Sequence, residues 1–184
     1  THLINTHWHY DHVSGNSAFG KSGARILAHE NTKIRLSTKQ TVAFLQRSFN
    51  PLPAEGIPAD TFKDAGQLKH GAETLHYRHL PPAHTDGDAT IHFHNANVYH
   101  GGDLLFFGMY PFIDYSSGGS LAGMAANAER IAKAVDAKTK IIPGHGPVGG
   151  KKDVQEFGSM LAASLESISK LVHEAQESAL TTDS

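Results

Sequence analysis

The segment THWHYDH near the start of the chain restricts the possible folds, because three histidines and one aspartate fall within seven residues. The chain holds 14 histidines in 184 residues, so a chance cluster is the first alternative. On an extended segment His7 and His9 project to the same face, whereas the adjacent Asp11 and His12 diverge. If the chain turns after Tyr10, one pair can serve one cation and the other pair a second. Imidazole and carboxylate are ligands that zinc, iron and manganese accept.

Three further positions could complete a metal site, and each is expected where a strand gives way to a loop. His84 stands in PPAHTDGD, Asp103 follows two glycines, and His145 stands between glycines in PGHGP. Taken alone, each histidine suggests a loop residue bonded to backbone, and Asp103 suggests a turn aspartate. Together with the first cluster, all three favour metal ligation. His92 and His94 also alternate on a strand, but no carboxylate follows them, so we expect a polar sheet face there.

Composition narrows the class of protein. Hydrophobic residues make up 39% of the chain and charged residues 18%, which is ordinary for a globular protein. A length of 184 residues fits one domain. The formal net charge of -2 creates no field that attracts nucleic acid, and no apolar run has the length of a membrane span, so we expect neither partner. Cysteine is absent, which excludes thiolate ligands and a cysteine nucleophile. Cytoplasm and periplasm both stay open as compartments.

Segments with strand and helix patterns alternate along the chain, which predicts α/β layers with function on the loops at strand ends. Expected strands cover residues 2–6, 24–28, 62–68, 74–80, 89–93, 97–100, 104–107 and 138–142. Expected helices cover residues 30–45, 121–135 and 154–178, and Ser120 is expected to cap the second of them. Three prolines indicate an ordered excursion over residues 50–59, and residues 110–120 are expected to form a loop.

In this order the motifs resemble those of the metallo-β-lactamase-fold superfamily. THWHYDH is similar to its HxHxDH signature, and AHTDGD, HGGDLLF and PGHGP are similar to its later motifs. The resemblance runs from about Leu3 to about Ala163, and it implies an αββα sandwich with a dinuclear metal site at one edge. It implies that the first metal is bound by His7, His9 and His84, and the second by Asp11, His12 and His145. Asp103 would bridge both metals.

Within the superfamily, the chain resembles the glyoxalase II-like, general hydrolase branch, where an aspartate bridges the metals as Asp103 would here. The lack of cysteine excludes the lactamase ligand set that contains it, and His9 stands where electron-transferring diiron members carry glutamate. The family usually has strands before the HxHxDH strand, whereas this chain begins six residues before His7. We therefore expect residues 1–184 to form a single domain that lacks the N-terminal part of the fold and has an open sheet edge.

The resemblance also implies a reaction. A hydroxide that bridges two metal ions would attack an ester, thioester, amide or lactam carbonyl of a small-molecule substrate. We expect two zinc ions per chain, with iron or manganese as alternatives. Asp11 would orient the nucleophile and shuttle its proton while also binding metal.

Residues around the ligands are expected to have two further roles. The residues expected to line the substrate cleft are Trp8, Tyr10, Tyr110, Phe112, Asp114 and Ser117. A metal-bound histidine usually donates its second N–H to a partner, and Thr6, Asp86 and Asp88 are the expected partners. Two other functions stay open: a mononuclear non-haem iron enzyme of the persulfide dioxygenase type, and a metal-binding fragment without turnover. The oligomeric state is left open as well.

Overall fold

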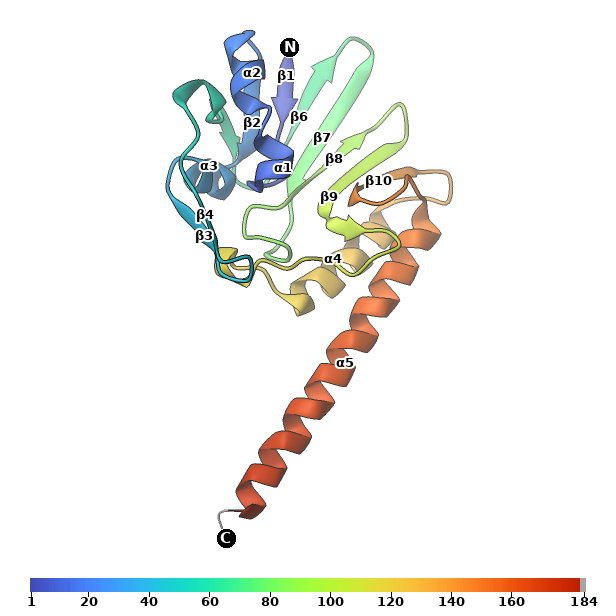
Figure 1. Cartoon of the computed structure of the whole chain (residues 1–184). Helices are drawn as coiled ribbons and strands as arrows, with labels where there is room; N and C mark the ends of the chain where they lie inside the picture. The colour runs from blue at the N-terminus through green and yellow to red at the C-terminus, as the bar shows by residue number, and fades with distance from the viewer. Residues whose placement is uncertain (183–184) are drawn as a thin grey trace.

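Three parallel strands form the smaller of the two sheets that make up the body of the protein (Figure 1). The computed structural model describes residues 1–182, with side chains for residues 1–178. The strands β1 (His2–Ile4), β2 (Arg25–His29) and β5 (Asp60–Phe62) lie in the order β1-β2-β5. Ile26, Leu27 and Ala28 of β2 are all buried, because layers cover both faces of a central parallel strand.

The larger sheet has five strands in the order β10-β9-β8-β7-β6. They are β6 (Ala65–His70), β7 (Glu73–His79), β8 (Ala89–Phe93), β9 (Val98–Phe106) and β10 (Lys140–His145). The last strand pairs with β9 in parallel, and all other neighbours are antiparallel. The β6–β7 turn places Gly71 at φ +59°, a left-handed conformation that glycine adopts without steric cost.

Helices cover the outer side of each sheet. The helices α1 (Tyr10–Val13), α2 (Asn16–Lys21) and α3 (Glu30–Leu36) lie with the smaller sheet, and α4 (Leu121–Ala134) and α5 (Lys151–Thr182) with the larger one. The main core joins β9 and β10 to both long helices, with Leu105, Met124, Ile141 and Leu161 almost fully buried. A smaller cluster of Leu27, Phe62 and Ala89 fills the space between the sheets. The expected αββα sandwich is confirmed, and Ser120 caps α4 by accepting from the Gly123 N–H.

The helix expected over residues 30–45 is wrong in its second half. α3 ends at Leu36, where the Ser37 and Thr38 hydroxyls bond back to carbonyls of the preceding turn and compete with continuation of the helix. The chain then forms an antiparallel hairpin of β3 (Gln40–Val42) and β4 (Arg47–Phe49). Val42 is buried in a cluster with Trp8, Val13 and Leu36, so tertiary packing decides the conformation of this segment.

Several other boundaries differ from those expected. Residues 62–68 are not one strand, because the chain leaves β5 and enters β6 of the other sheet. The two strands expected over residues 97–107 are one strand, β9, which continues through Gly102 at φ +54°. The chain also forms two short 3-10 helices, η1 (Ala54–Gly56) and η2 (Tyr115–Ser117). α5 extends beyond residues 154–178 in both directions, and residues 183–184 of the expected domain lie outside the described part.

The open edge expected in the first sheet is present at β1, which pairs with β2 on one side only among the described strands. A cavity of about 440 Å³ lies beside this edge. Its apolar lining comes from β1 and from the larger sheet, with Leu3, Ile4, Leu75 and Ile91 among the residues. None of the helices in residues 1–182 combines the length and the apolar character needed to cross a membrane.

Candidate metal centre

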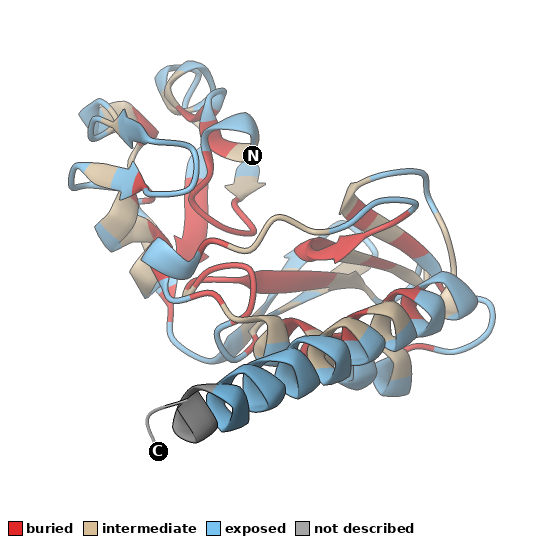
Figure 2. Ribbon diagram, turned by 60° about the horizontal axis from the view of Figure 1, so that its bottom comes forward, coloured by how far each residue is buried: buried red, intermediate tan, exposed pale blue. Residues whose placement is uncertain are grey.

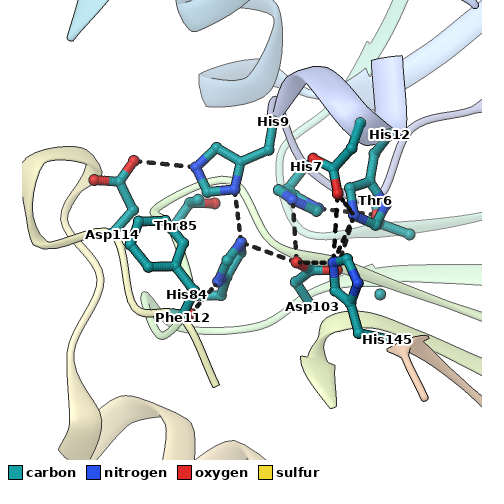
Figure 3. A network of polar contacts seen from close by, with 12 residues as sticks. Thr6, His7, His9, His12, His84, Thr85, Asp103, Phe112, Asp114 and His145 are labelled. Atoms are coloured by element: carbon teal, nitrogen blue, oxygen red, sulfur yellow. Dashed lines mark hydrogen bonds and ion pairs between the residues drawn. The ribbon is translucent and has the colours of Figure 1, made fainter. Parts of the chain in front are cut away.

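Side chains from four segments that are distant in sequence point toward one another in one polar network (Figure 3). The loop after β1 supplies His7 and His9, and helix α1, which follows it, supplies Asp11 and His12. Asp103 projects from β9, His84 from the loop after β7, and His145 from the last position of β10. All seven side chains that the sequence indicated as ligands therefore come together, in two groups.

The first group is buried. His7, His9, His84 and Asp103 each offer one ligand atom, and these atoms all lie within 4.8 Å of one another. His84 Nε2 lies 2.8 Å from His9 Nδ1 and 3.4 Å from Asp103 Oδ2. His7 Nε2 lies 3.8 Å from the same Asp103 oxygen.

The second group is more open to solvent. Asp11, His12 and His145 also bring their ligand atoms within 4.8 Å of one another. Asp11 Oδ2 lies 3.2 Å from His12 Nε2 and 3.4 Å from His145 Nε2. Asp103 reaches this group too, with Oδ1 at 3.1 Å from His12 Nε2 and Oδ2 at 3.2 Å from His145 Nε2. One buried carboxylate thus contacts both groups.

Local backbone structure separates the ligands into these groups. His9 is extended, with φ -63° and ψ 145°, and helix α1 begins at the next residue, so the chain turns slightly earlier than expected. His7 and His9 consequently face the first group, while the helix directs Asp11 and His12 to the second. Asp103 was expected to end a turn, but it lies within strand β9.

The donor atoms fit a bound cation. His7 Nε2 is buried and has no hydrogen-bond partner among the described residues, which is costly for a polar atom unless something else satisfies it. Burial and four neighbouring histidines hold the pKa of His7 well below its usual value, and burial lowers the pKa of His84 to about 4. Both rings are therefore neutral at pH 7, which is the form that binds metal. Burial opposes ionisation of Asp103, but the histidines around it, first His12, outweigh that effect and lower its pKa.

Comparisons with known proteins agree with this geometry. A family model described as the metallo-beta-lactamase superfamily matches residues 1–150.

The chain belongs to the metallo-β-lactamase superfamily.

Solved structures show the same fold at low sequence identity. A metallo-beta-lactamase from Pontibacter korlensis aligns with a TM-score of 0.67 and 21% identity, over 86% of this chain and 67% of that one. The DIM-1 metallo-beta-lactamase aligns with a TM-score of 0.68 and 16% identity, over 88% of this chain and 68% of that one. The VMB-1 structure aligns with a TM-score of 0.68 and 13% identity, over 88% of this chain and 67% of that one. A search of curated protein sequences gave no match. The histidine and aspartate cluster of this metallo-β-lactamase-fold protein is thus a metal-binding site in a superfamily of metal-dependent hydrolases.

A buried hydrogen-bond network orients His9. Its Nε2 donates to Asp114 Oδ2 at 3.1 Å, leaving Nδ1 directed at the other ligands of the first group. Asp114 also accepts from Ser116 and Ser117, and the Ser117 hydroxyl in turn accepts from Trp8 Nε1 at 3.1 Å. Burial opposes ionisation of Asp114, but these donors lower its pKa far below the usual range, so it stays a carboxylate.

This network corrects three expectations about the substrate cleft. Trp8, Asp114 and Ser117 are 3%, 2% and 2% exposed, so they support the ligands instead of lining a cleft. The sequence could not identify this role, because Asp114 lies 105 residues from His9 and no motif joins the two.

The other histidine partners are partly as expected. The Thr6 hydroxyl lies 3.1 Å from His7 Nδ1, and His84 Nδ1 donates to the Phe112 carbonyl at 2.7 Å. Asp88 was expected to bond to a histidine ring. Its carboxylate instead accepts hydrogen bonds from the His84 and Thr85 backbone N–H groups and fixes that loop. Asp86 does not contact a ligand histidine in the described part of the chain, but forms a two-pronged ion pair with Arg35 at 2.7 Å.

A small cavity of about 100 Å³ opens over the cluster. Its lining includes Asp11, Asp103 and His145, together with Tyr10 and Phe112, which were expected there. The β3–β4 hairpin contributes Val42, Leu45 and Phe49, which were not expected there because the sequence predicted a helix over part of this segment. Tyr110 lines a different cavity, with Phe107, Met109 and Met160, and is not among the residues that line the cavity over the cluster.

Replacing Asp114 by Asn should weaken metal binding roughly 10- to 100-fold, the usual cost of losing a partner of a ligand histidine. Three donors converge on Asp114, and a neutral amide offers them only one oxygen. Titration with a metal-competing dye measures the change. Ser116→Ala is the matched control, because it keeps the His9–Asp114 bond, and it should bind metal nearly as the wild type does. Equal affinities in all three proteins would contradict the assigned role.

Gly144→Ala should disturb the cluster from the opposite side. A Cβ at Gly144 would lie 1.9 Å from Asp103 Oδ1 and 2.8 Å from the Asp103 backbone nitrogen, so the carboxylate must move. A Cβ at Gly150 would meet nothing closer than 3.8 Å, so Gly150→Ala is the control. We expect Gly144→Ala to lose metal affinity by at least about tenfold, as for loss of an orienting group. Isothermal titration of both apo-proteins with Zn²⁺ checks this, and unchanged binding by Gly144→Ala would show that the carboxylate position is not constrained here.

Proposed function

We propose that residues 1–184 form a single domain that acts as a binuclear, zinc-dependent hydrolase of the bridging-aspartate branch. The observation that carries the proposal is the contact of one carboxylate, Asp103, with both ligand groups. In this proposal His7, His9 and His84 hold one ion, Asp11, His12 and His145 hold the other, and Asp103 binds both. Imidazole and carboxylate donors without thiolate suit zinc, and they also accept iron or manganese.

Two bound divalent ions would supply Lewis acidity towards a carbonyl oxygen and would make a water molecule acidic near neutral pH. The protein supplies the rest of the chemistry. Asp11 is the ligand carboxylate nearer to solvent, with a side chain 40% exposed, and it lines the cavity over the cluster. It can therefore orient the attacking water and take up its proton. Asp103 is 4% exposed and serves as a fixed negative charge instead.

The cavity walls suggest what the substrate presents to the centre. Phe49, Phe106 and Phe112 surround the open side of the cluster, so an apolar group next to the reacting carbonyl would pack there. An ester, thioester, amide or lactam of a small molecule fits this arrangement.

Replacing Asp11 by Asn tests the proton-transfer role. The amide keeps an oxygen for the metal but cannot accept a proton, so turnover should fall roughly 10²- to 10⁴-fold, the range for loss of general base catalysis. Zinc content must be measured on the same sample, and Asp64→Asn provides a control carboxylate on an exposed connection. Turnover like that of the wild type, in an Asp11→Asn protein that still holds two metals, would refute the role.

A mononuclear iron enzyme is the second candidate, and the unequal burial of the two groups favours it. The first group is fully buried, whereas Asp11, His12 and His145 are partly or largely exposed. Metal analysis separates the candidates: two zinc ions per chain with hydrolysis of a chromogenic ester or β-lactam supports the first. One iron ion with oxygen consumption supports the second. Bound metal without either activity would indicate a binding role.

A further inference from the structure

Helix α5 has two halves with different surroundings. Val154, Phe157 and Leu161 in its first half are buried in the main core beside α4. Beyond them the helix leaves the body and continues into solvent, as Figures 1 and 2 show from two directions. Every residue from 166 to 178 is exposed. The helix has 32 residues, which corresponds to a length of about 48 Å at 1.5 Å per residue.

The projecting half keeps an apolar stripe although nothing in the chain covers it within the described residues. Leu165, Ile168 and Val172 follow Leu161 at intervals of four, three and four residues, so they extend the same face that is buried in the core. Ile168, Leu171 and Val172 are 50%, 65% and 50% exposed. A stripe with this spacing is typical of a helix that packs on another helix.

The charges of this half lie away from the stripe. Lys170 pairs with Glu174, and His173 with Glu177, at one-turn spacing along the helix. The stripe itself is flanked by the uncharged residues Ser164, Ser169 and Gln176. A partner helix can therefore approach the stripe without meeting a row of like charges.

The outer side of α4 and α5 carries a groove that is complementary to such a helix. A cavity of about 590 Å³ runs between the two helices, and its floor and walls include Ala125, Ala126, Ala132, Gly158 and Ala162. Small side chains allow a third helix to approach closely. Lys133, Lys151 and Glu129 also line the groove, so lysines outnumber glutamates there, whereas residues 165–178 hold three glutamates and one lysine.

We propose that two copies of this chain associate through α5, antiparallel, with the projecting half of each copy seated in the α4–α5 groove of the other. The occupant is a second copy because one chain carries both parts of the contact, the uncharged stripe and the groove lined by small residues. The two parts also carry net charges of opposite sign, which attract at a distance although the charged side chains of the projecting half lie off the stripe. An antiparallel overlap of two long helices brings the projecting half of one beside the first half of the other. The arrangement has two identical contacts and closes on itself as a dimer.

Light scattering coupled to gel filtration of the full chain tests the proposal, with the dimer mass as the expected result. Ile168→Glu combined with Val172→Glu charges the stripe and should give the monomer mass, with dimer affinity reduced by more than about tenfold. The matched control, Ala163→Glu with Ser167→Glu, also adds two carboxylates four residues apart, but on exposed positions off the stripe, and should remain a dimer.

A variant in the groove tests whether the partner's helix binds there. Ala126→Glu places a charge in the groove without changing α5, and it should also give the monomer mass. If Ala126→Glu remains a dimer while the stripe variant is a monomer, the projecting half does not bind in the groove. A wild-type chain that is a monomer at all concentrations would overturn the whole proposal. Circular dichroism and zinc content, both expected to be unchanged in every variant, show that each one is folded.

Discussion

Replacing Asp103 by Asn should abolish binuclear metal binding and reduce hydrolysis roughly 10²- to 10⁴-fold, since a metal ion contributes several kcal/mol of transition-state stabilisation. Asp103 lies at ion-pair distances of 3.1 to 3.8 Å from four histidines that belong to the two ligand groups. Among the described residues, no other side chain forms ion pairs with histidines of both groups. The two groups together contain five histidines and two aspartates, so the substitution removes half of the anionic charge available to two divalent ions.

The size of this effect depends on burial. Asp103 is 4% exposed, so no solvent replaces its charge, and two cations held close together would repel each other strongly in a poorly polarisable environment. Plasma emission analysis after gel filtration should find at most one metal per chain in Asp103→Asn, and two in the wild type and in Asp64→Asn. A variant that keeps two metals and normal turnover would mean that Asp103 is not shared between them.

Acidification should remove the metals in two steps, and the second group should lose its ion first. Burial opposes protonation of His12, but hydrogen bonds and charge from Asp103 and Asp11 outweigh it and raise its pKa. A proton therefore competes with the metal at His12 as soon as the pH falls below that raised pKa, which lies above the usual value for histidine. At His84 the competition begins only near pH 4, and at His7 the pKa is also well below its usual value.

The expected occupancy is therefore two metals near pH 7.5 and one near pH 5, with a loss of affinity at the second group of about tenfold per pH unit for each proton taken up. Dialysis at a series of pH values, followed by metal analysis, gives the two steps. Simultaneous loss of both metals, or earlier loss from the first group, would contradict the assignment of the sites.

The sequence predicted the seven clustered side chains because each ligand type stands at a recognisable position. Two pairs fall within THWHYDH, and the three others stand near glycines or prolines: His84 in the loop after β7, Asp103 within β9 and His145 at the end of β10. Alternation on an extended segment put His7 and His9 together, and the helix that begins at Tyr10 separates Asp11 and His12 from them. These are local rules that need no knowledge of distant contacts.

The surroundings of the cluster could not be predicted in the same way, because long-range packing determines them. The β3–β4 hairpin has apolar residues at spacings that also fit a helix, and its conformation depends on burial of Val42 in the cluster that contains Trp8. Asp114 lies in a loop, and only the fold brings it to His9. The open edge at β1, by contrast, is visible from strand pairing alone, because β1 pairs only with β2 among the described strands.

Anomalous diffraction from zinc-loaded crystals would locate the metal ions directly. We expect two zinc peaks per chain, one bound by His7, His9 and His84 and the other by Asp11, His12 and His145. Nitrogen ligands should lie at about 2.0–2.1 Å, and oxygens of Asp103 within about 2.2 Å of both peaks. A single fully occupied peak on the first group, or two peaks without Asp103 between them, would contradict a binuclear centre that is built on one shared carboxylate.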